Sequence, residues 1–247
     1  MHGRTESLAG SPRFIPLPVV GTGMPMKASG GGSVNEVDRW EGGAGWIAYP
    51  EEGMQRASHA LTGDGVWVVD PVDAPGLDEF LADLGEVAGV VVTLDRHKRD
   101  SAALARRHDV AVHVPSWMSG VEPKLDAPVE RLGDRLGGTG FEVRRVIDNP
   151  FWQEAALYDP ERRVLLTPEV FGTVDYYCAP GERVGVHPML RLLPPRELGR
   201  LDVDRLLCGH GEGVPEGAGA AISAALSGAR RKAPGLYLKT LRNALGG

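Results

Sequence analysis

The chain has 247 residues, of which 42% are hydrophobic and 24% are charged, as is ordinary for a globular protein with a substantial core. Its 27 Lys and Arg against 33 Asp and Glu leave a formal net charge of −6. A dedicated nucleic-acid binder usually carries a basic face, so we expect no nucleic-acid partner.

The cysteine content and the lack of long apolar runs indicate which cellular compartment to expect. Only Cys178 and Cys208 are present, which excludes a disulfide framework and favours a reducing environment. No apolar run approaches the roughly 20 residues that span a bilayer. Prolines also interrupt the short apolar stretch near the N-terminus, unlike in a secretory signal. We predict a cytoplasmic protein with no membrane partner.

The N-terminal region differs in composition from the rest of the chain. Residues 1–35 are rich in Gly, Pro and Ser and end in the run Ala28–Ser33. Such a composition predicts a flexible or loosely packed arm. We expect residues 36–247 to form a single domain.

The first half of that domain alternates between strand-like and helix-like patterns. Alternating or continuous apolar runs predict strands, at residues 56–62, 65–70, 90–93 and 110–114. Apolar residues spaced for one helical face predict helices, at residues 77–84 and 102–107. Strands that alternate with helices are typical of an α/β domain.

The second half contains further strands and two closing helices. The predicted strands are residues 143–147, 154–158, 164–167 and 205–208. The predicted helices are residues 216–229 and 234–244, and Pro234 begins the second because proline is well tolerated in a first turn. Two αβ halves would accommodate these elements.

Six short segments, in their order and spacing, carry a resemblance to a known family. They are Gly65–Pro71, Val90–Thr93 with the polar loop after it, Val112–Pro115, Glu154–Tyr158, Val164–Thr167 and Leu206–Gly211. With them the chain resembles the metallo-β-lactamase fold superfamily over roughly residues 46–230. The resemblance implies an α/β fold, a four-layer αβ/βα sandwich of metallo-β-lactamase type.

The resemblance also implies where a metal site would lie. The superfamily uses a His-x-His-x-Asp-His loop, a later histidine, an acidic residue and a final histidine. Zinc needs imidazoles and carboxylates that converge at about 2.0–2.2 Å, with one position open for water. By resemblance, His97 matches the second histidine and His210 the final one, and Glu169 stands at the acidic position.

The other positions of the motif differ from the family pattern. Asp95 stands at the first histidine, Arg99 at the metal-binding aspartate and Asp100 at the last histidine of the loop, and residues 149–153 lack the expected histidine. A permanently charged guanidinium repels a divalent ion and can neutralise carboxylates. We predict that Arg99 replaces the cation in an ion-pair cluster with Asp95, Asp100 and Glu169, and we favour no metal or other cofactor.

Three functions stay open at this point. The predicted cleft is lined by seven residues, which are Asp95, His97, Arg99, Asp100, Gln153, Glu169 and His210. The leading hypothesis is a metallo-β-lactamase-like protein with an eroded metal site that binds a small-molecule ligand without the usual hydrolysis. The alternative is a hydrolase in which His97, Asp100, Glu169 and His210 hold a single zinc, iron or manganese ion and cleave an ester, thioester or phosphoester. The third is a structural role through a homodimer.

Candidate catalytic residues are few, and each has an ordinary explanation beside the functional one. Asp100 and Glu154 are candidates for a general acid or base. Asp100, like Ser101, could instead cap the following helix, and a glutamate that begins a strand is as often structural. Ordinary surface or strand roles are expected for the scattered histidines, which are His59, His108, His113 and His187. The aromatic residues in loops could line a pocket or pack in the core. They are Trp117, Phe151, Trp152, Tyr176 and Tyr177.

Overall fold

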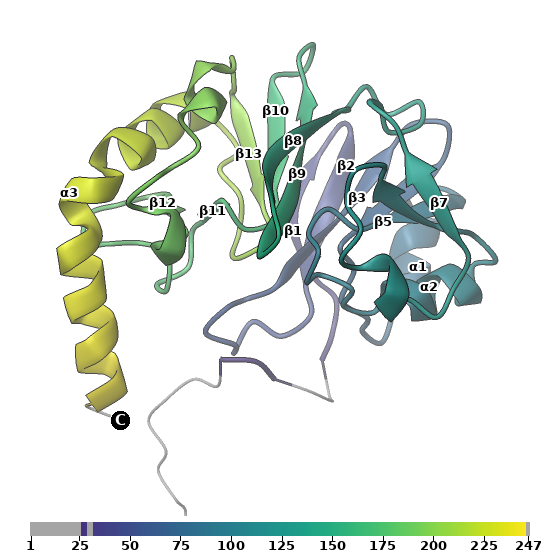
Figure 1. Ribbon diagram of the computed structural model, residues 1–247. Coiled ribbons are helices and arrows are strands. Elements are labelled where there is room, and N and C mark those ends of the chain that lie inside the picture. The colour runs from purple at the N-terminus through teal and green to yellow at the C-terminus, as the bar shows by residue number, and fades with distance from the viewer. Residues whose placement is uncertain (1–25, 29–31, 246–247) are drawn as a thin grey trace, which may run out of the picture.

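The computed structural model describes residues 26–28 and 32–245. Most of the predicted N-terminal arm lies outside these residues, so its organisation stays a prediction. The described chain forms two large β-sheets with a shared hydrophobic core between them and helices on their outer sides (Figure 1).

The first sheet has seven strands arranged in chain order. They are β1 (Asn35–Trp40), β2 (Gly43–Ile47), β3 (Ala57–Thr62), β4 (Val66–Val69), β5 (Val87–Val91), β6 (Val112–Pro115) and β7 (Val129–Leu132). Strands β1 to β4 pair antiparallel, and β4 to β7 pair parallel. Parallel neighbours need crossover connections, and α1 (Leu77–Ala82) and α2 (Ser101–Arg107) lie in two of these.

The second sheet has four strands in the order β13-β10-β9-β8. They are β8 (Glu142–Asn149), β9 (Trp152–Asp159), β10 (Val164–Thr167) and β13 (Arg205–Cys208). Strands β8, β9 and β10 pair antiparallel, whereas β10 and β13 are parallel. The long helix α3 (Ala218–Leu245) follows β13. Smaller elements connect β10 to β13, namely β11 (Phe171–Gly172), β12 (Gly185–Val186) and the 3₁₀ turns η2 (Pro188–Leu190) and η3 (Arg196–Arg200), and a further turn, η1 (Glu122–Lys124), precedes β7.

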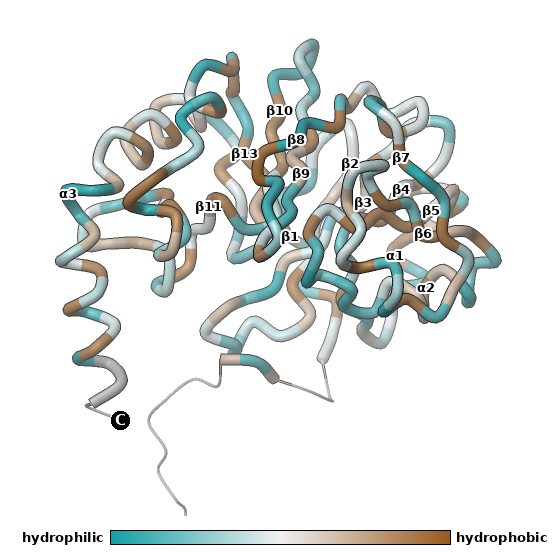
Figure 2. Tube along the Cα trace, in the orientation of Figure 1, coloured by the Kyte–Doolittle hydropathy of each residue, from teal (hydrophilic) through white to brown (hydrophobic). Residues whose placement is uncertain are grey.

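Three hydrophobic clusters join the layers. One lies between the two sheets and includes Leu61, Val91, Leu157 and Leu166. A second joins the first sheet to α1 and α2, and a third joins the second sheet to α3. Figure 2 shows hydrophobic residues concentrated on the inner strands and hydrophilic residues on the outer loops. This arrangement confirms the predicted αβ/βα sandwich.

The C-terminal helix departs from the prediction. Residues 216–229 and 234–244 were expected to form two helices, but one helix, α3, runs through Pro234. A proline inside a helix removes one i→i−4 hydrogen bond and bends the axis rather than always ending the helix. Figure 1 shows that α3 changes direction along its length. Among the described helices, none is both long enough and apolar enough to cross a bilayer.

Two glycine-containing strands explain why the strand boundaries were predicted less well. Strand β2 was not predicted at all, and β5 begins at Val87 rather than at residue 90. A Cβ on Gly43 would lie 2.0 Å from the Ala60 carbonyl oxygen, and a Cβ on Gly89 would lie 2.7 Å from the Trp67 ring. Close packing therefore requires glycine inside these strands, where glycine usually marks an interruption.

The ends of four parallel-paired strands meet at one edge of the sandwich. Asp70 follows β4, His97 lies in the loop after β5, Glu169 follows β10 and His210 follows β13. A backbone hydrogen bond of 3.0 Å from Ala57 to Gly209 joins the two sheets there. The carboxyl ends of parallel strands commonly carry ligand sites in α/β folds, and the candidate site lies at this edge.

Candidate functional site

Three side chains from both sheets converge at this edge. One ligand-type atom from each of His97, Glu169 and His210 lies within 4.8 Å of the other two. Glu169 Oε1 is 3.7 Å from His97 Nε2 and 3.8 Å from His210 Nε2. The residues are buried but not sealed, with 6%, 8% and 3% exposure respectively. They form a cluster that reaches the surface.

Asp70 sets the orientation of His97. Asp70 Oδ2 lies 3.4 Å from His97 Nδ1, and the Thr93 backbone N–H donates to Asp70 Oδ1 at 2.9 Å. Burial by itself raises the pKa of Asp70, but His97, Arg99 and Thr93 together lower it below its ordinary value. The ionised carboxylate therefore accepts a hydrogen bond from Nδ1–H, and the lone pair of His97 remains on Nε2.

A backbone carbonyl sets the orientation of His210. His210 Nδ1 lies 2.9 Å from the Met54 carbonyl oxygen, which can only accept a hydrogen bond. The Nε2 atom is buried and has no hydrogen-bond partner among the described residues. Burial lowers the pKa of His210 well below its ordinary value, and Arg99 and His97 lower it further. The ring is thus neutral, with its lone pair on Nε2 beside Glu169.

Both glycines that flank His210 are required for this placement. Gly211 has a φ of 84°, and a Cβ on Gly209 would lie 2.2 Å from the Pro168 carbonyl oxygen. A side chain at either position would strain the backbone. The Gly-His-Gly segment therefore lets the end of β13 pass close to the segment that carries Glu169.

Glu169 supplies the only carboxylate that reaches both imidazoles among the described residues. Its Oε2 atom is buried without a partner. Burial raises the pKa of this carboxyl, but the adjacent rings of His97, His210 and His187 outweigh it and lower the pKa to about 2. An ionised oxygen without a partner in a buried site is costly unless a cation or donor balances it.

Glu154 supports Glu169 from behind. Its Oε1 accepts hydrogen bonds from the backbone N–H groups of Glu169 (3.1 Å) and Val170 (2.9 Å), and its Oε2 accepts from Trp152 Nε1 at 2.8 Å. The side chain is fully buried, and burial raises its pKa to about 8. Both oxygens of Glu154 are therefore engaged inside the protein, as suits the structural role that was weighed beside general acid or base.

Arg99 points inward, but it does not form the predicted ion-pair cluster. Its Nη1 donates to the carbonyl oxygens of Ala57 and Asp70, both at 2.7 Å, and its Nη2 donates to that of Gly209 at 3.2 Å. Among the described residues, no carboxylate forms an ion pair with it. Residue 99 has a φ of 37°. This backbone conformation directs the guanidinium toward the carbonyl oxygens at the strand ends. The correction is that Arg99 joins the ends of β3, β4 and β13.

The two aspartates of the predicted cluster are engaged elsewhere. Asp95 Oδ1 is 3.4 Å from Arg96 Nε. Asp100 precedes α2 as its N-cap residue but makes no side-chain capping bond, and its Oδ2 accepts from the Asp73 backbone N–H at 2.9 Å. Neither aspartate belongs to the group that converges on Glu169.

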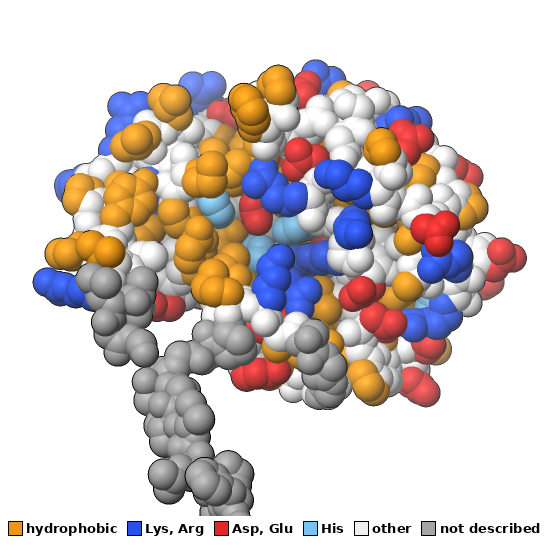
Figure 3. All heavy atoms as spheres, turned by 60° about the horizontal axis from the view of Figure 1, so that its bottom comes forward, with side chains coloured by type: hydrophobic (Ala, Val, Ile, Leu, Met, Phe, Trp, Pro, Cys, Tyr) orange, Lys and Arg blue, Asp and Glu red, His pale blue; other side chains and the backbone are white. Residues whose placement is uncertain are grey.

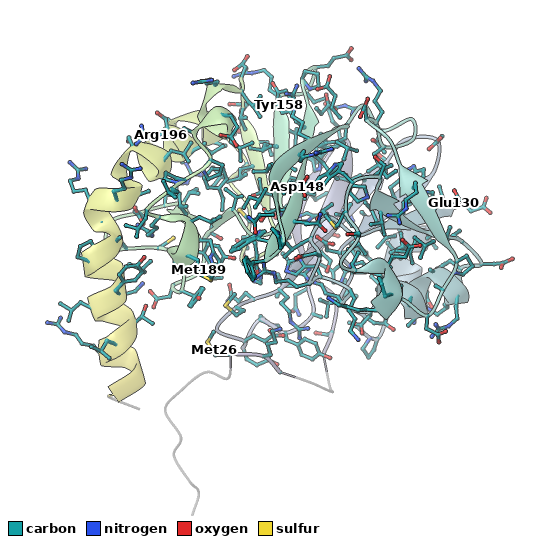
Figure 4. The ribbon with its side chains drawn as sticks, viewed as in Figure 1. Met26, Glu130, Asp148, Tyr158, Met189 and Arg196 are labelled. Carbon is teal, nitrogen blue, oxygen red and sulfur yellow. The ribbon has the colours of Figure 1, made fainter. Side chains whose placement is uncertain are left out.

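Gln153 stabilises the wall beside the cluster rather than the cluster itself. Its amide nitrogen donates to the Trp117 carbonyl oxygen at 3.1 Å and to Asp148 Oδ1 at 2.9 Å. Asp148, labelled in Figure 4, lies on β8. The Gln153 amide oxygen accepts from the backbone N–H groups of Ser119 (3.1 Å) and Gly120 (3.3 Å). Gln153 thus ties β9 to the segment that follows β6.

Several residues that build the site were not recognised from the sequence. The contact between the Met54 carbonyl oxygen and His210 cannot be predicted from residue identity, because it is made by the backbone. Asp70 belongs to the segment Gly65–Pro71, but its contact with His97 depends on the pairing of β4 with β5. Tyr177, which was among the loop aromatics expected in a pocket wall or the core, stacks on His210 with ring centroids 5.5 Å apart, and His187 packs on Tyr177 at 5.4 Å. His187 was expected to be an ordinary surface or strand histidine.

The donor set fits one small divalent cation. Two imidazole nitrogens and a carboxylate are a common set for zinc or iron. Ligand atoms that surround a zinc ion tetrahedrally lie roughly 3.4 Å apart, and here Glu169 Oε1 is 3.7 and 3.8 Å from the two nitrogens. The unpartnered atoms His210 Nε2 and Glu169 Oε2 agree with such a site.

The surface around the cluster has two unlike sides. Figure 3 shows histidine side chains between a region of mostly hydrophobic side chains and a region where Lys and Arg gather. The guanidinium of Arg96, the residue before His97, lies 4.2 Å from the centre of the Trp152 ring. A ligand bound here would therefore meet apolar, aromatic and cationic groups.

The chain matches known proteins in three-dimensional structure only. No protein-family model and no curated protein matches the chain. The DIM-1 metallo-β-lactamase superposes with a TM-score of 0.56 at 14% identity, over 82% of this chain and 97% of its own. The FIM-1 metallo-β-lactamase from Pseudomonas aeruginosa, in its mono-zinc form, gives 0.54 at 11% identity, over 85% and 99%. The Flv1 flavodiiron core from Synechocystis sp. PCC6803 gives 0.57 at 14% identity, over 80% and 61%. The chain therefore has the metallo-β-lactamase fold, with a His–Glu–His cluster at the edge where its two sheets meet.

Proposed function

We propose that this protein is a metal-dependent hydrolase that uses one divalent cation, zinc, iron or manganese, to cleave an ester, thioester or phosphoester. The observation that carries the proposal is the convergence of His97 Nε2, His210 Nε2 and the Glu169 carboxylate within 4.8 Å. Both rings already hold their other nitrogen in a hydrogen bond that leaves Nε2 free to bind a metal.

The surroundings support one ion rather than two. Arg99 keeps a positive charge close to His210, whose pKa it lowers. The fixed positive charge of the Arg99 guanidinium repels a second cation near His210. Asp95 and Asp100, which could have supplied further ligands, are held by Arg96 and by the Asp73 backbone. The metal set therefore loses Asp100 from the four residues that the sequence suggested.

The chain's own residues prepare the site for hydrolysis. Asp70 and the Met54 carbonyl keep the protons of the two histidines on Nδ1, and Glu154 holds the backbone at Glu169. When bound, a divalent ion supplies Lewis acidity, which polarises a carbonyl or phosphoryl oxygen and lowers the pKa of water. The apolar and cationic sides of the surface (Figure 3) would orient a substrate above the cluster.

The second candidate is ligand binding without hydrolysis, and Arg99 is the observation that favours it. Its guanidinium is a built-in cation at the strand ends, and the same charge that opposes a second metal weakens the first. An anionic small molecule could then bind without a metal. This function predicts a ligand-dependent rise in melting temperature without turnover.

Metal content and turnover separate the two candidates. Protein purified without chelator is analysed for bound metal, and stripped protein is titrated with Zn²⁺, Mn²⁺ and Fe²⁺ by calorimetry. We expect one ion per chain, and binding at least about 100-fold weaker in Glu169→Gln and His210→Asn. His108→Asn, a histidine on the outer surface beside Asp78, is the matched control. Turnover of p-nitrophenyl esters that chelator abolishes and metal restores supports the hydrolase. Absence of metal uptake excludes it.

A further inference from the structure

His187 lies beside the candidate metal site without belonging to it. It connects β12 to η2 and is 6% exposed. Its backbone N–H donates to the Val170 carbonyl oxygen at 3.0 Å, one residue beyond Glu169. Its ring packs edge-on against Trp152 at 4.9 Å and Tyr177 at 5.4 Å between centroids. The same Tyr177 ring stacks on His210, so one aromatic residue separates His187 from a candidate ligand.

Hydrogen bonding fixes which nitrogen of His187 carries the proton. The Met189 backbone N–H donates to Nδ1 at 3.2 Å, so Nδ1 holds a lone pair. A neutral ring must then carry its proton on Nε2. Burial lowers the pKa of His187 to about 4, against the opposing effect of Glu169, so the ring is neutral at physiological pH.

The Nε2–H group of His187 has no hydrogen-bond partner among the described residues, and it is not one of the fully enclosed polar atoms. It is therefore a donor that reaches the surface from a residue that is otherwise buried. The Trp152 ring that packs against His187 also contacts the Arg96 guanidinium, 4.2 Å from the ring centre, so His187 shares an aromatic neighbour with the residue that precedes His97.

We propose that His187 donates its Nε2–H to the carbonyl oxygen of a carboxylic ester or thioester. This inference rests on the proposed function and narrows its substrate class. As water adds to the carbonyl carbon, the C=O π electrons move to oxygen, and the resulting oxyanion accepts the hydrogen bond from His187. The C–O or C–S bond then breaks, the leaving group takes the bonding pair and one proton of the water, and the acid product releases the other proton.

The neutral donor of His187 and its aromatic neighbours favour an acyl substrate over a phosphoester. A neutral N–H donor suits a carbonyl oxygen that gains a single negative charge, whereas phosphoryl transfer is served by cationic groups. The neighbours of His187 are the aromatic rings of Trp152, Tyr176 and Tyr177. Met189, labelled in Figure 4, is 73% exposed and lies two residues further along the chain. These groups suit an ester with an apolar chain.

Two substitutions at His187 distinguish its role as a hydrogen-bond donor from its role in packing. His187→Gln keeps an N–H donor near the Nε2 position. His187→Asn keeps an acceptor for the Met189 N–H but removes the distal donor. With zinc-loaded enzyme and p-nitrophenyl butyrate and octanoate, we expect kcat to fall by about 10²–10³ in His187→Asn, with KM nearly unchanged, and to be largely retained in His187→Gln. Hydrolysis of bis(p-nitrophenyl) phosphate should differ little between the two variants.

Two further measurements do not depend on turnover. Calorimetric Zn²⁺ affinity should be the same in wild type, His187→Gln and His187→Asn. Long-range ¹H–¹⁵N spectra of the wild type, assigned by comparison with His187→Gln, should show His187 protonated on Nε2 only from pH 6 to 8. A proton on Nδ1, equal kcat in the two variants, or a phosphodiester loss as large as the ester loss would overturn the inference while zinc still binds. Failure of the wild type to bind zinc would overturn the proposed function and this inference with it.

Discussion

Asp70 Oδ2 lies 3.4 Å from His97 Nδ1, and this contact decides which nitrogen of His97 faces Glu169. Carboxylates behind metal-binding histidines typically change metal affinity by about 10–100-fold when replaced. We therefore expect Asp70→Asn to bind zinc roughly 10–100-fold more weakly than the wild type, measured by calorimetry. Asparagine is the suitable substitution because residue 70 has a φ of 44°, which asparagine tolerates.

The control for that experiment is an aspartate of similar position but different contacts. Asp73 pairs with Arg107 on the outer surface, so Asp73→Asn should leave zinc affinity unchanged. Equal affinity in Asp70→Asn and the wild type would show that His97 does not need the carboxylate to present Nε2.

Arg99 is expected to act as a structural connector rather than as a substitute for metal. Arg99→Met removes three hydrogen bonds from a charged donor to the carbonyls of Ala57, Asp70 and Gly209. Bonds from charged donors contribute about 1.5–3 kcal/mol each, so the free energy of unfolding should fall by at least about 2 kcal/mol in urea melts. Zinc affinity should rise, because a positive charge near His210 is removed.

Arg99→Lys distinguishes geometry from charge. A lysine ammonium keeps the charge but lacks the planar fork that reaches several carbonyls at once. We expect it to lose most of the stability that Arg99→Met loses, while zinc affinity stays at the wild-type level. Full stability in Arg99→Lys would mean that the charge alone matters, as the predicted ion-pair cluster required.

Residue identity predicted the metal-type side chains but not what orients them. His97, Glu169 and His210 were placed by resemblance, and the structure brings all three together. Asp100 was expected with them, but the turn before α2 directs its carboxylate to the Asp73 backbone. Arg99 was expected to pair with carboxylates, yet it donates to backbone carbonyls, which every residue possesses and which no sequence pattern marks.

The layers of the fold were more accessible from the sequence than its edges. Continuous apolar runs such as Val164–Thr167 correspond to fully buried strands, because such strands are covered on both faces. Strand β1, with an exposed edge and a bulge between Val37 and Trp40, has no comparable signal. His187 could not be recognised either, since its packing against Trp152 and Tyr177 is a tertiary feature.

Two glycines of helix α3 have different surroundings, and alanine substitutions can test whether each is required for packing. A Cβ on Gly235 would meet nothing within 4 Å, whereas a Cβ on Gly219 would lie 2.7 Å from the Val203 carbonyl oxygen. Glycine costs about 1 kcal/mol relative to alanine inside a helix. Gly235→Ala should therefore raise the free energy of unfolding by about 0.5–1 kcal/mol, and Gly219→Ala should lower it. A gain from both substitutions would contradict the close packing of α3 on the segment before β13.

The buried carboxyl of Glu154 should leave a signature in the pH dependence of stability. Burial raises its pKa to about 8 in the folded chain, from an ordinary value of 4.5. Between these values the folded state keeps a proton that the unfolded state has lost, so raising the pH favours unfolding. The contribution of Glu154 should therefore fall by about 1.4 kcal/mol per pH unit within that window.

Glu154→Gln isolates this effect from the other titrating groups. Glutamine cannot titrate, and the weakened contact with Trp152 Nε1 that it causes is the same at every pH. Urea melts of both proteins in chelator should show the wild type losing stability relative to Glu154→Gln as the pH rises from about 4.5 to about 8. A constant difference would mean that the three N–H donors around the carboxylate hold it ionised despite its burial, because hydrogen bonds to the charged form oppose desolvation.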